Sequence, residues 1–305
     1  MTDLPAAGTR VSLRYRLPTG STPPHTDVVG HLVEVSPIVR VRTRHGDVVD
    51  VVPEDVLAVR VVPEMPVRTG EIRNLEHAAA LGWPGTEQQW LDGWLMRAGM
   101  GSTRRANSAV PLRFTSHAEL VAAADWYASR GLPALISAAD RLFRVPDDVP
   151  VEAETLVMAG DLSRAAAVPD LALSACPDRR WRAVNSRDVP DEVFTAVVDG
   201  AVVFGELAGA AVGRAAVTDA PDGTRWVGLS AVHVSDDARR RGLARTLCAG
   251  LLEWARERGA TRAYVQVVID NGAARALYES MGFVVHHRLR YVRAEDLLAR
   301  APVVG

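Results

Sequence analysis

The sequence predicts a mixed α/β (α+β) fold, in which a mixed, twisted sheet is flanked by helices and preceded by a small all-β barrel. Three observations predict it. Short runs of strand character with turn signals occupy the first 65 residues; strand, helix, glycine and strand succeed one another from Trp226 to Ile269; and a similar order occurs earlier, in the middle of the chain. We expect three parts, at residues 1–65, 74–150 and 151–305.

Composition excludes several classes of protein. The chain has 305 residues, of which 48% are hydrophobic, enough for a sizeable core in about two domains. A formal net charge of -2 disfavours a nucleic-acid partner or an anionic membrane. Two cysteines, Cys176 and Cys248, give neither a disulfide framework nor a metal-ligand spacing, so no metal is expected. Without a signal peptide or long apolar run, the prediction is a cytoplasmic protein with no membrane partner.

The N-terminal 65 residues read as five short strands, which predict a small SH3-like barrel. The strands are expected at Arg10 to Leu17, Val28 to Val35, Ile38 to Thr43, Asp47 to Val52 and Ala58 to Val62. Arginines alternate along them as strand-face residues do: Arg10, Arg14, Arg16, Arg40, Arg42 and Arg44. We favour a solvated face over a nucleic-acid or peptide site. A linker follows at residues 63–66.

The middle segment, residues 74–150, predicts a degenerate half-copy of the C-terminal fold. Leu75 to Leu81 reads as a helix, Trp90 to Met96 and Ala106 to Arg113 as strands, Glu119 to Ser129 as a helix, and Leu132 to Ala138 as a strand. The turn before its second helix, residues 114–117, contains no glycine, so we expect no cofactor there.

The C-terminal part predicts an antiparallel sheet, a helix, a parallel partner strand, a second helix and closing strands. Strands are expected at Glu154 to Ala159, Ala201 to Leu207, Ala210 to Thr218, Trp226 to Val234, Arg262 to Ile269 and His286 to Val292. Residues 164–182 read as an irregular link, and Asp191 to Val198 as a helix. Leu243, Leu247 and Leu251 mark the apolar stripe of the main helix, which Gly259 ends.

One turn in this part has the chemistry of an anion site. Arg239 to Ala244 lies between a strand and the start of the main helix. Free N–H groups and the helix dipole favour a phosphate there, and Gly242 allows a close backbone approach. The turn fits neither the P-loop nor the dinucleotide-binding glycine motif.

The spacing of two motifs resembles that of the GNAT-type N-acetyltransferase superfamily. Arg239, Gly242 and Ala244 match its R-x-x-G-x-A turn. A downstream helix matches N-x-x-A-x-x-L-Y-x-x-x-G-F at Asn271, Ala274, Leu277, Tyr278, Gly282 and Phe283. The resemblance covers residues of about 150 to 295. Actinobacterial members with an N-terminal barrel, described as N-acetylglutamate synthases or as histone-type acetyltransferases, have the same arrangement.

The resemblance implies acetyl-CoA as the cofactor. The pyrophosphate would lie on the turn, and the pantetheine arm would pair with the end of the strand that closes at Val234, where this strand splays from the next. The implied cofactor-binding residues are Val232, Val234, Arg239, Arg240, Arg241, Gly242, Leu243, Ala244, Asn271, Ala274 and Tyr278.

The implied catalytic groups are the N–H of Val234 and the phenol of Tyr278. The N–H would polarise the thioester carbonyl, and the phenol would protonate the leaving thiolate; the alternative is a core tyrosine. Many relatives place a carboxylate base on the strand Trp226 to Val234, but this one has no acid. Candidates for the base are His233, Glu206, His286 and His287, or a water chain. Proximity alone could serve a small free amine.

A polar stretch from Arg97 to Ser108 is the candidate acceptor site. Its arginines could hold a carboxylate bidentately; equally, it could be a hairpin with solvated arginines. The substrate-site candidates are Arg97, Arg104, Arg105, Asn107, Glu206 and His233.

We therefore expect an acetyl-CoA-dependent N-acetyltransferase acting on a primary amine. A small amino acid, with glutamate as one candidate, ranks ahead of protein lysine. A non-catalytic acyl-CoA sensor is the second interpretation, and a nucleic-acid-binding barrel with a passenger domain is the third. A homodimer is compatible with the sequence.

Overall fold

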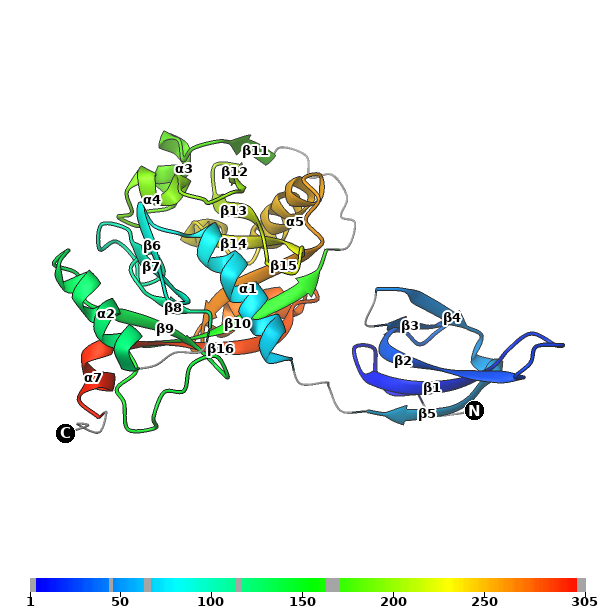
Figure 1. Ribbon diagram of the computed structural model, residues 1–305. Helices are drawn as coiled ribbons and strands as arrows, with labels where there is room; N and C mark the ends of the chain where they lie inside the picture. Colours follow the sequence, from blue (N-terminus) through cyan, green and yellow to red (C-terminus); the bar gives the residue numbers. More distant parts are fainter. Residues whose placement is uncertain (1–3, 44–45, 63–66, 114–116, 163–170, 301–305) are drawn as a thin grey trace. The chain divides into compact units, whose positions relative to one another are not determined.

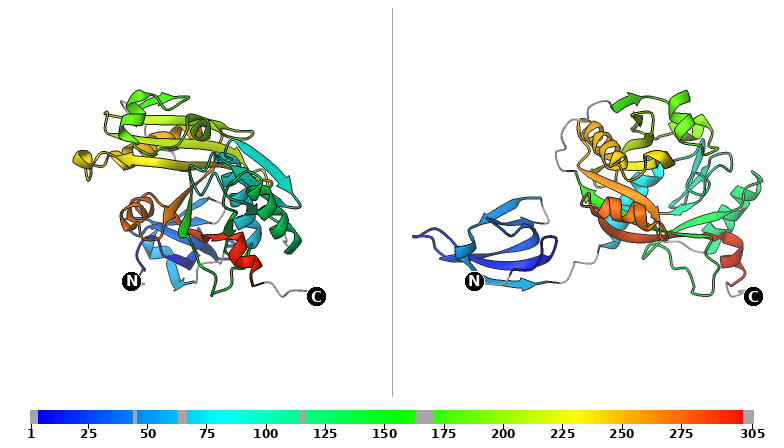
Figure 2. Two further views of the ribbon diagram at one scale, coloured as in Figure 1. Left: turned by 90° about the vertical axis from the view of Figure 1, so that its left-hand side faces the viewer. Right: turned by 180° about the vertical axis from the view of Figure 1, so that it is seen from behind.

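The computed structural model describes residues 4–43, 46–62, 67–113, 117–162 and 171–300. Two compact units divide the chain, Met1–Pro66 and Val67–Gly305. Figures 1 and 2 show their ribbons.

The N-terminal unit is one antiparallel sheet in the order β4-β3-β2-β1-β5. Its strands are β1 (Arg10–Arg16), β2 (His25–Glu34), β3 (Val39–Thr43), β4 (Val48–Val51) and β5 (Val56–Val61). Apolar residues alternate into one core, as Val28 and Leu32 do along β2. The predicted all-β module with five strands is confirmed.

The C-terminal unit contains an eight-stranded mixed sheet in the order β11-β12-β13-β14-β15-β10-β16-β9 and a three-stranded sheet, β6-β7-β8. The strands are β6 (Glu87–Leu91), β7 (Trp94–Ala98), β8 (Val110–Pro111), β9 (Leu135–Ala139), β10 (Ala153–Asp161), β11 (Leu171–Ser174), β12 (Ala201–Leu207), β13 (Ala211–Asp219), β14 (Arg225–Val234), β15 (Arg262–Val268) and β16 (Val284–Arg293). The helices are α1 (Thr69–Gly82), α2 (His117–Ala128), α3 (Arg179–Val184), α4 (Asp191–Thr195), α5 (Leu243–Arg256), α6 (Gly272–Glu279) and α7 (Ala294–Leu298). A mixed α/β fold is confirmed.

Helices cover both faces of the large sheet. Helices α5 and α6 pack on one face, where Leu247, Leu251 and Tyr278 join a core with β13, β14 and β15. Helix α1 covers the other face, where Ile72 and Leu75 pack on the same strands. The views from the front and from behind show these two faces (Figure 1; Figure 2, right). We call the face covered by α5 and α6 the α5 face, and the face covered by α1 the α1 face.

The middle segment repeats the order of the C-terminal elements. Strands β6, β7 and β8 pair antiparallel, α2 follows, and β9 comes next, with Ile136 bridged in parallel to Ala109 just before β8. Strands β12, β13 and β14, helix α5 and the parallel strand β15 have the same order. The strand after β9, β10, pairs with β15, and β16 in turn pairs with β9. The last strand of each half thus pairs with strands of the other half, which supports the half-repeat; its boundaries stay a prediction. The turn at residues 114–116 lies outside the described residues.

Three sequence-based expectations in this unit were wrong. Trp90 to Met96 is not one strand but a β6–β7 hairpin, because Asp92 and Gly93 both adopt positive φ; Asp-Gly between apolar residues is the usual signal for such a turn. Of the strand expected at 106–113, only Val110–Pro111 forms a strand, beside the single bridge at Ala109, and Pro111 has no N–H to extend the ladder. The link at 164–182 contains β11 and the start of α3 in its described part.

Candidate active site

Strands β14 and β15 separate towards their C-terminal ends. They pair in parallel from Trp226 and Arg262 to Leu229 and Val265. Beyond that pair, β14 continues beside β13 and β15 continues beside β10. A bulge at this point, with Ala231 at φ 52°, turns β14 away. The result is an opening in the sheet between residues 230–234 and 266–268, where the splay was expected.

The arginine-rich turn lies between β14 and α5. Gly242 caps α5 in the left-handed conformation (φ 79°), and Arg240 is also left-handed (φ 59°). Among the described residues no side chain caps this end of α5, so the N–H groups of its first turn are left for an external acceptor. Arg239 pairs with Asp236 at 2.6 Å, and Arg240 and Arg241 are exposed. The predicted pyrophosphate turn therefore has the backbone of an anion site.

The N–H of Val234 points into the opening. Ser235, the next residue, donates its N–H to the carbonyl of Ala210 at 2.8 Å, on the β13 side. Successive N–H groups along a strand point to opposite sides. That of Val234 therefore points away from β13, towards the side on which β15 has separated, which suits the proposed polarising contact.

Tyr278 and Asn271 lie on α6, but their side chains are engaged within the protein. The Oδ1 of Asn271 caps α6 by accepting the N–H of Ala274 at 3.0 Å. Tyr278 is 6% exposed and packs on Phe283. Burial raises its pKa well above 10, and the hydrogen bond of its hydroxyl with Cys248 adds to the rise. Burial also raises the pKa of the Cys248 thiol to about 12, so that thiol is no nucleophile.

Two of the six predicted acceptor residues, Arg97 and Asn107, stabilise their own loop. The buried guanidinium of Arg97 donates to the carbonyls of Trp83 and Ser108 and to the Ser108 hydroxyl. Asn107 accepts the N–H groups of Gly99 and Gly101 at 2.8 and 3.0 Å. These contacts engage the polar groups of both side chains and favour a structural role, while their part in substrate binding stays a prediction. The exposed Arg104 faces Glu152 at 3.6 Å.

Arg105 differs from its neighbours. It is half-buried on the α1 face, with its guanidinium 5.5 Å from the centroid of the Trp83 ring. Its positive charge lowers the pKa of Tyr264, against the larger effect of burial, and acts on Tyr278 in the same way. Within the described residues it has no hydrogen bond or ion pair. Arg105 is thus a cation without a counter-ion in the described part of the chain.

Arg214 also contacts the indole ring of Trp83. Its buried guanidinium lies 4.5 Å from the centroid of Trp83 and donates to the carbonyls of Phe194, Ala196 and Gly82. The cation is held by carbonyl dipoles rather than by a carboxylate, so the region stays positive. Sequence reasoning missed Arg214, since a lone arginine within an apolar strand gives no signal for what it contacts.

Two buried oxygens beside the opening have no hydrogen-bond partner in the described part of the chain: Ser230 Oγ and Gln266 Oε1. Ser230 pairs across the ladder with Arg214, and Gln266 follows Val265, the last residue of β15 that pairs with β14. The indole Nε1 of Trp83 is a third unsatisfied buried atom. A buried polar atom without a partner is costly and uncommon, so its presence indicates a ligand position.

The candidate bases have different surroundings. Glu206 accepts the N–H of Gly209 in the β12–β13 turn, and His286 and His287 form a buried chain with Glu76: Nδ1 to Nδ1 at 2.8 Å, then Nε2 to Oε1 at 3.0 Å. These three residues are therefore occupied by structural contacts. His233, half-buried on β14 beside Val234, is the candidate that lies at the opening.

The comparisons with known proteins agree with this geometry. A family model described as "Probable histone acetyltransferase Rv0428c C-terminal" matches residues 69–292. The chain is 47% identical over 299 residues to "Probable histone acetyltransferase Rv0428c" of Mycobacterium tuberculosis, covering 97% of this chain and 98% of that protein. It is 25% identical to "Uncharacterized N-acetyltransferase YobR" of Bacillus subtilis over 73% of this chain and 99% of that protein.

A solved structure shows the same fold. A GCN5-related N-acetyltransferase from Kribbella flavida superposes with a TM-score of 0.51 at 15% identity, covering 74% of this chain and 95% of that one. The chain belongs to the GNAT family of N-acetyltransferases. It is an N-acetyltransferase of the GNAT class, and its candidate catalytic residue Val234 lies where β14 has separated from β15.

A second family model, "Rv0428c N-terminal Sm-like domain", matches residues 5–60 of this GNAT protein. Two arginines of this Sm-like unit are held in ion pairs: Arg14 with Asp27 at 2.8 Å, and Arg40 with Glu34 and Asp50 at 2.7 and 3.1 Å. Such pairing favours a solvated face over a phosphate-binding one. Arg44 lies outside the described residues.

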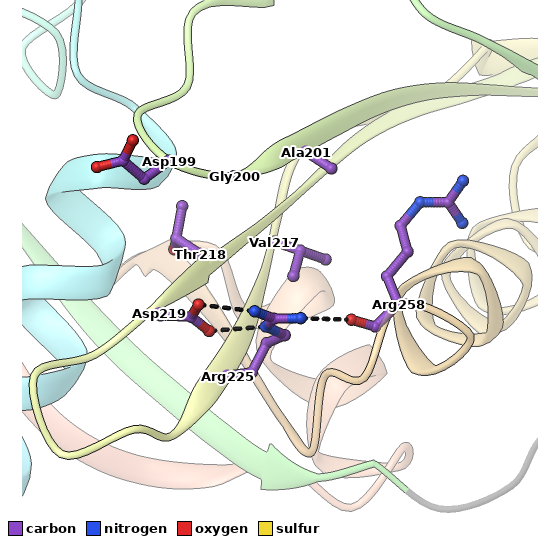
Figure 3. Close-up of a pocket in the computed structure, with 8 residues that line it drawn as sticks. All are labelled: Asp199, Gly200, Ala201, Val217, Thr218, Asp219, Arg225 and Arg258. Atoms are coloured by element: carbon purple, nitrogen blue, oxygen red, sulfur yellow. Dashed lines mark hydrogen bonds and ion pairs between the residues drawn. The ribbon is translucent and has the colours of Figure 1, made fainter.

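A pocket of about 370 Å³ lies at the other end of α5 from the pyrophosphate turn. Figure 3 shows its lining, in which the Arg225 guanidinium lies between the Asp219 carboxylate and the carbonyl of Arg258. The 14 residues of α5 put about 20 Å between the two ends. Because it lies a helix length away from that turn, this pocket is not part of the candidate GNAT site.

The described ranges contain neither a metal-binding cluster nor a membrane-spanning helix. No group of three or more His, Cys, Asp or Glu residues could hold a metal ion. No described helix is long and apolar enough to cross a membrane.

Proposed function

We propose that this GNAT protein transfers the acetyl group of acetyl-CoA to the amino group of a small acidic amino acid, with glutamate as the first candidate. The observation that carries the proposal is Arg105, a half-buried guanidinium with no partner among the described residues, held on Trp83. A carboxylate is the natural partner of such a cation, and a bidentate pair would fix its orientation.

The chain has groups that suit coenzyme A. The uncapped first turn of α5 and the left-handed Gly242 suit a pyrophosphate, and the N–H of Val234 suits the carbonyl of a thioester. The side chains of Arg240 and Arg241 would add charge at the turn. Bound there, acetyl-CoA would supply the activated acyl group and a thiolate leaving group.

Two tasks remain for the residues of this chain. The Tyr278 phenol, whose pKa is raised, stays protonated over the working pH range and so keeps a proton to donate at the leaving sulfur. To reach it, the hydroxyl must exchange its bond to Cys248 for one to the sulfur. His233 or solvent would accept the proton that the amine loses. Alignment of the reactants would supply much of the rate.

The test is thiol release from acetyl-CoA by the full chain, against glutamate, aspartate, glutamine, polyamines and lysine peptides. The variant Arg105→Gln should raise the KM for glutamate by about 10- to 100-fold, because it removes a charge-assisted pair. The neighbouring Arg104→Gln, which removes an exposed arginine facing Glu152, is the matched control and should change little. Equal rates for glutamate and glutamine in the wild type would refute an acidic acceptor.

A second candidate acceptor is protein lysine. It is favoured by the name of the 47% identical relative, a probable histone acetyltransferase, and by the presence of the Sm-like unit. Turnover on lysine peptides but not on amino acids, impaired by Arg42→Glu on the exposed side of β3, would support it. Binding of acetyl-CoA without turnover on any amine would favour the acyl-CoA sensor.

A further inference from the structure

We propose that Ser230 and Gln266 hold the amino group of the acceptor, by accepting its two N–H bonds at the point where β14 and β15 separate. The assignment rests on the proposed function. Ser230 Oγ and Gln266 Oε1 at the opening are both buried, and neither has a hydrogen-bond partner among the described residues. The amide oxygen of Gln266 can only accept, so its missing partner is a donor.

The two residues share a face and a level of the sheet. Leu229 and Val265 are the last parallel partners, and each is followed by one of the two residues. The leucine and the valine point to the α5 face, where both join its core. By alternation, Ser230 and Gln266 point to the α1 face. They therefore stand side by side at the mouth of the opening.

The same face carries the groups proposed for the carboxylate. Ser230 is the cross-strand partner of Arg214, whose guanidinium lies against Trp83, and Arg105 lies against the same indole. Tyr264, two residues before Gln266, lies close enough to both arginines for their charges to lower its pKa against the effect of burial. Unsatisfied acceptors at the opening and unsatisfied donors at Trp83 and Arg105 together match the amine and the side-chain carboxylate of an acidic amino acid.

This placement gives the two side chains a positioning task. With both N–H bonds fixed by the pair, the nitrogen lone pair is left to face the thioester carbonyl held at Val234. In the reaction the N–C bond forms and the C–S bond breaks. The nitrogen loses one proton to the Ser230 hydroxyl, which passes its own proton to His233 or water, and the sulfur gains one from Tyr278. The pair stays neutral after this relay, which fits a strand that lacks a carboxylate.

The variant Gln266→Leu tests the assignment in the full chain. A structural role for the amide predicts lower stability, whereas removal of an unsatisfied buried oxygen should leave the unfolding midpoint unchanged or raise it. We expect kcat/KM for glutamate to fall at least about 10-fold, mostly through KM, with the Kd for acetyl-CoA within about two-fold of wild type. Ser230→Ala should act in the same direction.

Glutarate, which lacks the amine, supplies a readout besides turnover. With coenzyme A present, the wild type should bind glutamate at least about 10-fold more tightly than glutarate, measured by tryptophan fluorescence, and Gln266→Leu should abolish that preference. Gln266→Glu restores an oxygen acceptor and should keep the preference, while adding an ionisation to the pH profile. A preference that survives both Gln266→Leu and Ser230→Ala overturns the assignment while leaving the proposed function intact. Absence of thiol release from every amine in the wild type overturns both.

Discussion

The phenol of Tyr264 lies against Gly228, its partner on the neighbouring parallel strand, so closely that a Cβ on the glycine would stand 2.2 Å from the phenolic oxygen. A Cβ on Gly82, at the end of α1, would meet the same oxygen at 3.1 Å. Burial raises the pKa of Tyr264 to about 12, so the group is a neutral spacer. Two glycines thus make room for the ring that lines the α1 side of the opening.

The variant Gly228→Ala should consequently be destabilising and should disturb acceptor binding. The ring must move before a methyl group fits, and such overpacking costs about 1–3 kcal/mol. We expect that loss in urea unfolding, with a raised KM for the acceptor and an unchanged Kd for acetyl-CoA. Gly272→Ala, in the first turn of α6 with no atom within 4 Å of the new Cβ, is the control and should not lose stability. Stability like that of the wild type in Gly228→Ala would contradict the packing argument.

The left-handed Gly242 gives a second prediction. Alanine there meets no atom within 4 Å but must adopt φ 79°, which costs about 1 kcal/mol. Gly209→Ala, in the β12–β13 turn at φ 64° and equally open, carries the same strain away from the cofactor. Both variants should lose similar stability, but only Gly242→Ala should weaken acetyl-CoA binding, by about 10-fold in calorimetry. Equal affinities would remove the turn from the cofactor site.

A third prediction concerns Tyr278. Tyr278→Phe removes the phenol but keeps the ring that packs on Phe283, so the fold and the Kd for acetyl-CoA should stay the same. Loss of a general acid should lower kcat by about 100-fold. Because burial raises the pKa well above 10, the phenol keeps its proton as the pH rises, and no alkaline loss of kcat below pH 10 should be traced to it. Full turnover in the variant would make Tyr278 a core tyrosine only.

Local sequence signals predicted the elements that carry the cofactor site. The bounds of β12 were predicted without error, and β13, β14 and the start of α5 within one residue, because alternating strands and an amphipathic helix leave periodic patterns. The Asp92-Gly93 turn was available in the sequence and was missed. The irregular Arg97–Asn107 loop could not be assigned, because only the folded loop shows which polar groups satisfy one another.

The acceptor side depends on contacts between distant segments. Trp83 follows α1, Arg105 comes from a loop, Arg214 from β13 and Gln266 from β15, and no periodic pattern connects them. Local sequence patterns also do not predict that β10 lies between β15 and β16 in the large sheet. The sequence therefore predicted the elements around the candidate cofactor site more closely than the contacts of the candidate acceptor site.

The buried chain of His286, His287 and Glu76 predicts loss of stability in acid. Burial, with the charges of His287, Arg262 and Arg141, lowers the pKa of His286 from 6.5 to about 3. Between these values the unfolded chain holds a proton on this histidine that the folded chain does not, so stability falls as the pH falls through that window. The wild type should lose roughly 2–3 kcal/mol from this group between pH 6.5 and 4.5.

The variant His286→Gln should flatten this dependence, even where it lowers stability at neutral pH. Urea unfolding at pH 6.5 and 4.5 measures the difference directly. His233→Gln removes a histidine from the same unit but leaves the hydrogen bonds among His286, His287 and Glu76 in place. This variant should show the same loss of stability between pH 6.5 and 4.5 as the wild type. An identical acid loss in His286→Gln and the wild type would mean that His286 titrates alike in both states and that its burial does not suppress protonation.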